Sequence, residues 1–135
     1  MTKKQLRELE YDITGACIEV HRNIGPGLLE SVYHKCLARE FQLRNIRFSS
    51  EMMVKVFYKD IDLETDLRVD FFVEQCIVLE LKAVEKILPI HEAQILTYMK
   101  LTECPKGLLV NFNCTNIIVE GKKSYVNSFY TEIPD

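Results

Sequence analysis

The stretch IVLELKAV, residues 77–84, decides the fold because it opens a strand–helix–strand unit. Its apolar residues predict a largely buried strand, and Pro89 predicts the start of a helix over residues 90–101. The segment GLLVNF, residues 107–112, predicts a strand that is buried on both faces of a sheet. A helix that joins two such strands implies a parallel pair with a right-handed crossover.

Two helices are predicted before this unit. Apolar residues recur at helical spacing over residues 6–20 and again over residues 28–43. The segment NIGPG, residues 23–27, separates the two helices because its glycines and proline break a helix and force a turn.

Between these helices and the strand–helix–strand unit, the hydrophobic period changes to two. This period predicts a strand over residues 53–58, a turn at Lys59-Asp60 and an extended stretch over residues 61–73. With residues 77–84 they would form an antiparallel meander at the edge of the sheet. The expected fold class is therefore α/β (α+β), a mixed β-sheet flanked by helices in the order α-α-β-β-β-α-β. After Gly121 the pattern predicts only a short tail.

Length and composition favour one globular domain over residues 1–135, because 47% of the 135 residues are apolar and 27% are charged. No apolar run approaches the ~20 residues of a membrane span, and the N-terminal residues lack the apolar segment of a secretory signal. Five widely spaced cysteines without a C-x-x-C pair indicate reduced thiols. We therefore expect a cytoplasmic protein with no membrane partner. The net charge of -3 means that an anionic partner would need a local basic patch.

Charged residues interrupt the predicted strands. Glu80 and Lys82 share one face of the strand over residues 77–84, about 7 Å apart. Asp70 is a lone acid among large apolar residues of the preceding stretch. In a hairpin, a three-residue loop over residues 74–76 would pair Asp70 with Glu80. A two-residue loop would pair Asp70 with Leu79 and send Glu80 to the other face.

Two interpretations of these charges remain open from the residues alone. Two carboxylates that converge at partial burial repel each other, and a hard divalent ion such as Mg²⁺ would relieve that cost. Lys82 could then stabilise an oxyanion or orient a water, as phosphoryl transfer requires. Alternatively, Glu80 and Lys82 lie on an exposed strand face, where they are solvated and weakly paired.

The motifs in their order resemble a known superfamily. Asp70 followed by Glu80-Leu81-Lys82 resembles the D…(D/E)-x-K signature of the PD-(D/E)XK nuclease superfamily, with Val69 where the signature has a proline that is not a ligand. The segment GLLESVY, residues 27–33, is similar to the G-x-x-E-x-x-Y motif that names a family of small bacterial proteins within it. The likeness covers about residues 10–113 and includes three further segments: His21–Gly27, Glu80–Val84 and His91–Gln94.

This resemblance implies a restriction-endonuclease-like core and a set of site residues. Asp70 and Glu80, with Glu30 on the preceding helix, would hold one or two Mg²⁺ or Mn²⁺ ions. Lys82 would position or activate the attacking water. The alternative for Glu30 is an ordinary half-exposed helical glutamate.

Gln94 and Tyr98 match the Q-x-x-x-Y motif of the RecB-like exonuclease branch. Positions four apart on a helix are neighbours, so both side chains can reach one site, with His91 on the same side of the helix. The alternative is a helix face that packs on the sheet and leaves polar tips at its rim.

The resemblance thus implies a metal-dependent nuclease that acts on nucleic acid, with DNA as the expected substrate. Its catalytic residues would be Asp70, Glu80, Lys82, Gln94 and Tyr98. Candidate contacts to the nucleic-acid backbone, chosen for nearness in sequence, are Arg22, Arg68, Lys86 and Lys100. Two alternatives are a catalytically inactive binding or accessory module, favoured by the acidic pI and small size, and a homodimer, which either function could use.

Overall fold

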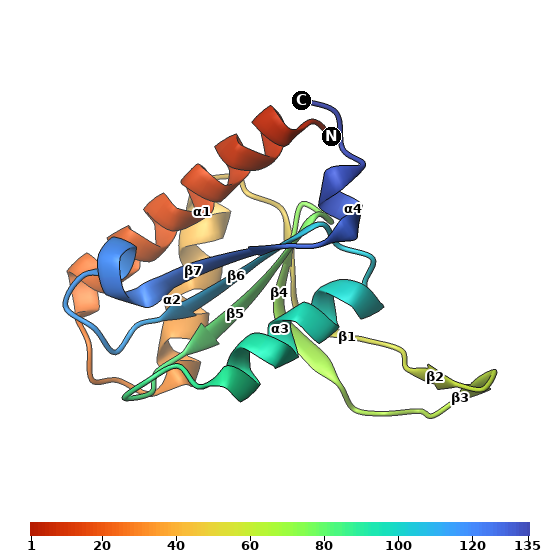
Figure 1. The fold of residues 1–135 in the computed structure, drawn as a ribbon. Helices are drawn as coiled ribbons and strands as arrows, with labels where there is room; N and C mark the ends of the chain where they lie inside the picture. Colours follow the sequence, from red (N-terminus) through yellow and green to blue (C-terminus); the bar gives the residue numbers. More distant parts are fainter.

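The computed structural model of the chain describes residues 1–135 and has a five-stranded sheet at its centre (Figure 1). The strand order is β1-β4-β5-β6-β7, with β5 and β6 parallel and the other pairs antiparallel. The first helices, α1 and α2, pack on one face of the sheet, and α3 packs on the other. This mixed sheet flanked by helices confirms the predicted fold class. The helices are α1 (Lys3–Ile24), α2 (Glu30–Leu43), α3 (Pro89–Leu101) and α4 (Ser128–Thr131), with a π-helical turn η1 (Ile117–Gly121).

The N-terminal helices follow the predicted pattern. Thr2 caps α1, since its side chain accepts a hydrogen bond from the Gln5 N–H while the Gln5 side chain accepts one from the Thr2 N–H. The helix ends at Gly25, whose φ of 68° lies in the left-handed region that favours glycine. None of the helices combines the length and the apolar character that a membrane span requires.

The strand–helix–strand unit is also confirmed. Strand β5 (Ile77–Lys82) pairs in parallel with β6 (Lys106–Asn111), and α3 forms the crossover between them. Almost every residue of both strands is buried, as expected for the centre of a sheet that is covered on both faces.

The predicted strand over residues 53–58 is wrong. The sheet strand is β1 (Phe48–Met53), and residues 57–58 belong to a separate hairpin of β2 (Phe57–Tyr58) and β3 (Ile61–Asp62). The turn at Lys59-Asp60 is confirmed, because both residues have positive φ. The stretch over residues 61–73 is likewise divided into β3 and β4 (Arg68–Val73). The sequence of β1 shows no alternating hydrophobic pattern because β1 is an edge strand whose residues are mostly exposed.

The C-terminal segment is not the featureless tail that the sequence predicts. After η1, strand β7 (Lys122–Val126) pairs antiparallel with β6 and closes that edge of the sheet. Polar contacts fix it in place: the carboxylate of Glu10 on α1 contacts the amines of Lys106 and Lys122 at 2.8 and 2.9 Å and accepts a hydrogen bond from the Ser124 hydroxyl. A strand whose residues are mostly exposed gives little hydrophobic signal in the sequence.

Candidate active site

Asp70 and Glu80 are opposite each other on neighbouring strands. The register of β4 and β5 joins Val73 to Ile77 and Phe71 to Leu79, with the three-residue loop over residues 74–76 between the strands. Continuing this register by one residue sets Asp70 against Glu80. The loop therefore has the odd number of residues that is needed to place Asp70 and Glu80 on the same face of the sheet.

The two acids replace regular strand pairing with contacts of their own. Glu80 Oε2 accepts a hydrogen bond of 2.7 Å from the Asp70 N–H, and Asp70 Oδ2 accepts one of 2.8 Å from the Leu81 N–H. Each carboxylate thus has one oxygen fixed by main chain, while no N–H of the protein is hydrogen bonded to the other oxygen. Both side chains are oriented before any ligand arrives.

The environment of Glu80 opposes its ionisation. Its side chain is 6% exposed, and burial raises its pKa to about 8, with the neighbouring charge of Asp70 acting in the same direction. The backbone N–H of Asp70 and the amine of Lys82 lower this pKa but do not offset the burial. Without an added cation, the ionised form of Glu80 is therefore strongly disfavoured.

Lys82 is the last residue of β5 and forms no ion pair in the protein. The chain that follows Lys82 is anchored by a polar residue of the neighbouring strand. Asn111, the opposite residue of β6, accepts a hydrogen bond from the Val84 N–H and donates one to the Val84 carbonyl. Asn111 is 5% exposed, and its only signal in the sequence is a polar residue inside an apolar strand. It holds the chain that follows Lys82 against the sheet.

Glu30 begins α2 on the same side of the molecule. With Asp70 it lines a polar pocket of about 460 Å³, which His34, Lys35 and Glu51 also line. Partial burial raises the pKa of Glu30, and the charge of Asp70 raises it further, whereas the amine of Lys82 lowers it. Glu30, Asp70 and Lys82 therefore share one electrostatic environment.

Tyr98 on α3 lies within electrostatic range of the acid pair, and Gln94 on the same helix contacts Tyr98. Gln94 Nε2 donates a hydrogen bond of 3.0 Å to the Tyr98 hydroxyl. Burial raises the pKa of Tyr98, as do the charges of Glu80 and Asp70, which places its hydroxyl near both acids. His91 has another role: its Nδ1 accepts a hydrogen bond from the Leu88 N–H, so its ring caps the start of α3.

Strands β1 and β4 twist at the position of Asp70, so that their side chains change from one face of the sheet to the other. Ser50 and Phe71 are paired and lie on the α2 side, where Ser50 contacts His34 and Phe71 joins the core beneath α1 and α2. Two residues along, Met52 and Val69 are paired but pack in the core beneath α3. Both strands therefore exchange faces at the intervening pair, Glu51 and Asp70, where Glu51 has the positive φ of 50°. This rotation places Asp70 between the two cores.

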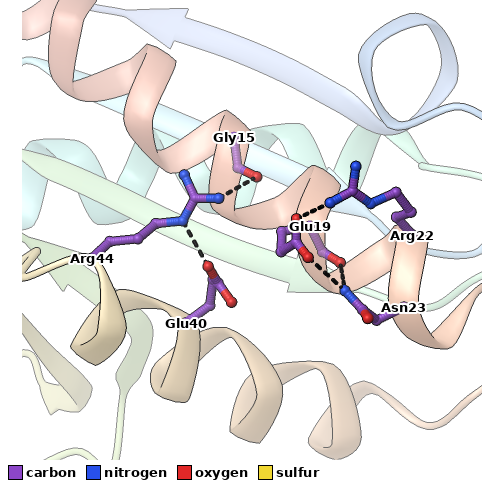
Figure 2. A network of polar contacts seen from close by, with 6 residues as sticks. All are labelled: Gly15, Glu19, Arg22, Asn23, Glu40 and Arg44. Carbon is purple, nitrogen blue, oxygen red and sulfur yellow. Dashed lines mark hydrogen bonds and ion pairs between the residues drawn. The ribbon is translucent and has the colours of Figure 1, made fainter.

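The candidate contacts to a nucleic-acid backbone differ in their surroundings. Arg22 pairs with Glu19 (Figure 2), and Arg68 pairs with Asp66 at 3.0 Å. Lys86 and Lys100 are exposed and form no ion pair.

A comparison with protein families identifies the chain. The model of the PD-(D/E)XK nuclease superfamily matches residues 7–123. This range includes all the candidate site residues: Glu30, Asp70, Glu80, Lys82, Gln94 and Tyr98. The chain belongs to the PD-(D/E)XK nuclease superfamily. Its mixed sheet with flanking helices is a restriction-endonuclease-like PD-(D/E)XK fold. Searches of curated proteins and of solved structures each found no match.

Membership of the PD-(D/E)XK superfamily indicates a nuclease with a nucleic-acid substrate, and such nucleases generally use divalent metal ions. As the side chains are placed, no group of three or more His, Cys, Asp or Glu could hold a metal ion. Two carboxylates are available as metal ligands, those of Asp70 and Glu80, because each has one oxygen that no backbone N–H is hydrogen bonded to. This set fits Mg²⁺, which keeps several waters and is usually bound by one or two carboxylates together with substrate phosphates.

Proposed function

We propose that this protein is a metal-dependent nuclease of the G-x-x-E-x-x-Y family that hydrolyses phosphodiester bonds in DNA. The observation that carries this proposal is the reciprocal contact of Asp70 and Glu80, which presents two oriented carboxylates beside the unpaired amine of Lys82. Lys82 forms no ion pair that would neutralise it, and a strongly raised pKa such as that of Glu80 is typical of functional sites.

In this proposal Asp70 and Glu80 hold Mg²⁺ or Mn²⁺, and Glu30 contributes from the start of α2. The bound ion supplies a more acidic water and charge stabilisation at the phosphate. Lys82 positions the attacking water and stabilises the negative charge that develops on the phosphate oxygens. Gln94 and Tyr98 orient the substrate from the side of α3. Glu80 must release its proton when the ion binds, since its pKa lies near 8 in the protein alone.

We further propose that residues 1–135 act as one domain. Leu6 near the N-terminus is buried in the same core as Phe71 and Leu108, and Tyr130 and Ile133 pack against that core. Both ends of the chain thus support the sheet that carries the site.

The proposal is tested with single-stranded, duplex and branched DNA and with RNA, each incubated with Mg²⁺ or Mn²⁺. Lys82→Ala is expected to reduce cleavage by roughly a hundredfold or more, as the loss of one transition-state donor does in other enzymes. Lys4→Ala is the matched control, because Lys4 is exposed at the start of α1 and forms no ion pair. Equal cleavage by wild type and Lys82→Ala would point to a contaminating nuclease.

The second candidate function is a non-catalytic binding or accessory module, which the net charge of -3 favours over a protein that grips a polyanion. Calorimetric titration with Mg²⁺ separates the two functions. The nuclease is expected to bind the ion in wild type and to lose binding in Asp70→Asn, whereas a module would bind it in neither.

A further inference from the structure

A hairpin arm projects from the sheet next to the candidate site. The arm, residues 55–66, contains β2 and β3 and extends away from the rest of the molecule (Figure 1). Its base is fixed, because Val54 is buried and its N–H donates a hydrogen bond of 2.8 Å to the Leu67 carbonyl. Its tip is a two-residue turn, Lys59-Asp60, in which both residues have the positive φ of a type I′ hairpin.

The arm exposes large apolar side chains that a two-stranded hairpin cannot bury by itself. Phe57, Tyr58 and Ile61 are 61%, 62% and 63% exposed. Such a hairpin is at best marginally stable in water without a further packing surface. Because direct partners share a face, Phe57 and Asp62 lie together on one face, and Tyr58 and Ile61 lie on the other. The first face combines an aromatic ring with a carboxylate.

The charge of the arm argues against a nucleic acid as its partner. The arm has two lysines and four acids, and three of these acids form no ion pair: Asp60, Asp62 and Glu64. An acidic element repels phosphates. The surface that fits it is an apolar groove with a basic rim.

The chain has such a groove between α1 and α2. Its volume is about 550 Å³, and Val20, Ile24 and Cys36 provide its apolar lining. Lys35 and Arg39 stand at its rim, exposed and without ion pairs.

The two acids of the groove are already neutralised. Figure 2 shows that Glu19 contacts Arg22 and Asn23, and that Glu40 contacts Arg44. The Arg44–Glu40 distance is 2.7 Å. The guanidinium of Arg44 also contacts the Gly15 carbonyl on α1. The charges left free in the groove are therefore positive.

We propose that the arm docks into the α1–α2 groove of a second copy of this chain, with Phe57 on the apolar lining and Asp62 paired with Arg39. The arm points away from α1 and α2 of its own chain (Figure 1), so the contact is made between copies. Two reciprocal contacts of this kind close a two-fold dimer. Lys35 lines both the groove and the pocket that contains Glu30 and Asp70, so the docked arm lies beside the candidate site of the second copy.

The test is the oligomeric state of the full chain, measured by analytical ultracentrifugation over a concentration series. A species with twice the mass of one chain is expected. Phe57→Ser and Arg39→Glu should each weaken the dimer roughly tenfold or more, since an aromatic ring and an arginine dominate such interfaces. Tyr11→Ser and Lys4→Glu are the matched controls, because both side chains are exposed on α1 outside the groove. They should leave the dimer unchanged.

A charge exchange tests the pairing directly. Asp62→Arg should disrupt the dimer, and the double variant Asp62→Arg with Arg39→Asp should restore it, a recovery that misfolding would not give. A wild type that stays monomeric at every concentration would overturn the proposal, as would a dimer that tolerates both Phe57→Ser and Arg39→Glu. The proposal would also be overturned if the protein is a monomer that binds single-stranded DNA, measured by fluorescence anisotropy, and if Phe57→Ser abolishes that binding. None of these measurements depends on nuclease activity.

Discussion

The backbone N–H of Asp70 donates a hydrogen bond to the carboxylate of Glu80, and Asp70 in turn accepts one from the residue that follows Glu80. The two acids therefore position each other through the main chain of the opposite strand. This arrangement keeps two repelling groups close together at a buried point, which a folded chain stabilises only if other interactions offset the cost. The raised pKa of Glu80 is the measurable sign of that cost.

Glu80→Gln is expected to stabilise the protein in the absence of divalent ions. The pKa of Glu80 is about 8 in the folded chain and near 4.5 in an unfolded one, so the folded state holds one more proton between these values. The free energy of unfolding of wild type should therefore fall as the pH rises from about 4.5 to about 8. A glutamine can keep the hydrogen bond from Asp70 without this loss. Denaturant titrations at several pH values should show a gap between variant and wild type that widens with pH. A gap independent of pH would contradict the assigned pKa.

Asp70→Asn is expected to lower the pKa of Glu80 toward its usual range, because the neighbouring charge disappears while the amide oxygen can still accept from the Leu81 N–H. An NMR titration of the Glu80 carboxyl carbon measures this shift directly. Asp12→Asn, at an exposed acid on α1 that forms no ion pair, is the control and should leave the titration unchanged. An unchanged pKa in Asp70→Asn would mean that the acids do not converge in solution.

Asn111→Ala is expected to reduce cleavage of DNA without contact between Asn111 and substrate. The alanine leaves the Val84 N–H without its partner and removes the shorter of the two hydrogen bonds to the Val84 carbonyl, so the segment after Lys82 loses most of its anchor. The free energy of unfolding should fall by about 1–3 kcal/mol, and kcat should fall more than KM rises. Asn113→Ala is a useful comparison, since that exposed side chain makes only a longer contact of 3.3 Å to the same carbonyl. Equal effects of both variants would rule out a special role for Asn111.

Glu10→Gln is expected to cost roughly 2–4 kcal/mol in the free energy of unfolding, because it leaves the amines of Lys106 and Lys122 without their carboxylate. The hydrogen bonds and charges of these lysines hold the pKa of Glu10 down at about 2 despite the opposing effect of its burial. The stability that Glu10 contributes should therefore be present above about pH 4.5 and be lost as the pH falls toward about 2. Denaturant unfolding of wild type, Glu10→Gln and the exposed control Glu8→Gln over this range measures the effect. A loss in Glu8→Gln of the same size would indicate a general effect of helix charge.

The sequence predicted those elements whose residues follow a hydrophobic period. The strand–helix–strand unit from Ile77 to Asn111 was foreseen because its strands are buried on both faces and Pro89 marks the start of the helix. Strands β1 and β7 were missed or misplaced for the opposite reason. Both lie at edges of the sheet, where most of their side chains face solvent.

The sequence predicted a set of residues for the candidate site but not their geometry. Nothing in the residues from Glu74 to Cys76 decided between a loop of two and a loop of three, and only the latter sets Asp70 against Glu80. The rotation at Glu51 has no sequence signal either, since a glutamate rarely adopts a positive φ. Asn111 is a polar residue inside the apolar strand that the sequence predicts over residues 107–112. Its role depends on a partner 27 positions away in the sequence.

The arm is attached through a single pair of residues, Val54 and Leu67, beyond the point at which β1 and β4 exchange faces. Its length and composition can therefore change without altering how Asp70 meets Glu80. Residues 55–66 form a natural graft point, at which a different hairpin or a binding peptide could replace the native one. The molecule thus separates the part that would carry the chemistry from the part that would contact a second copy.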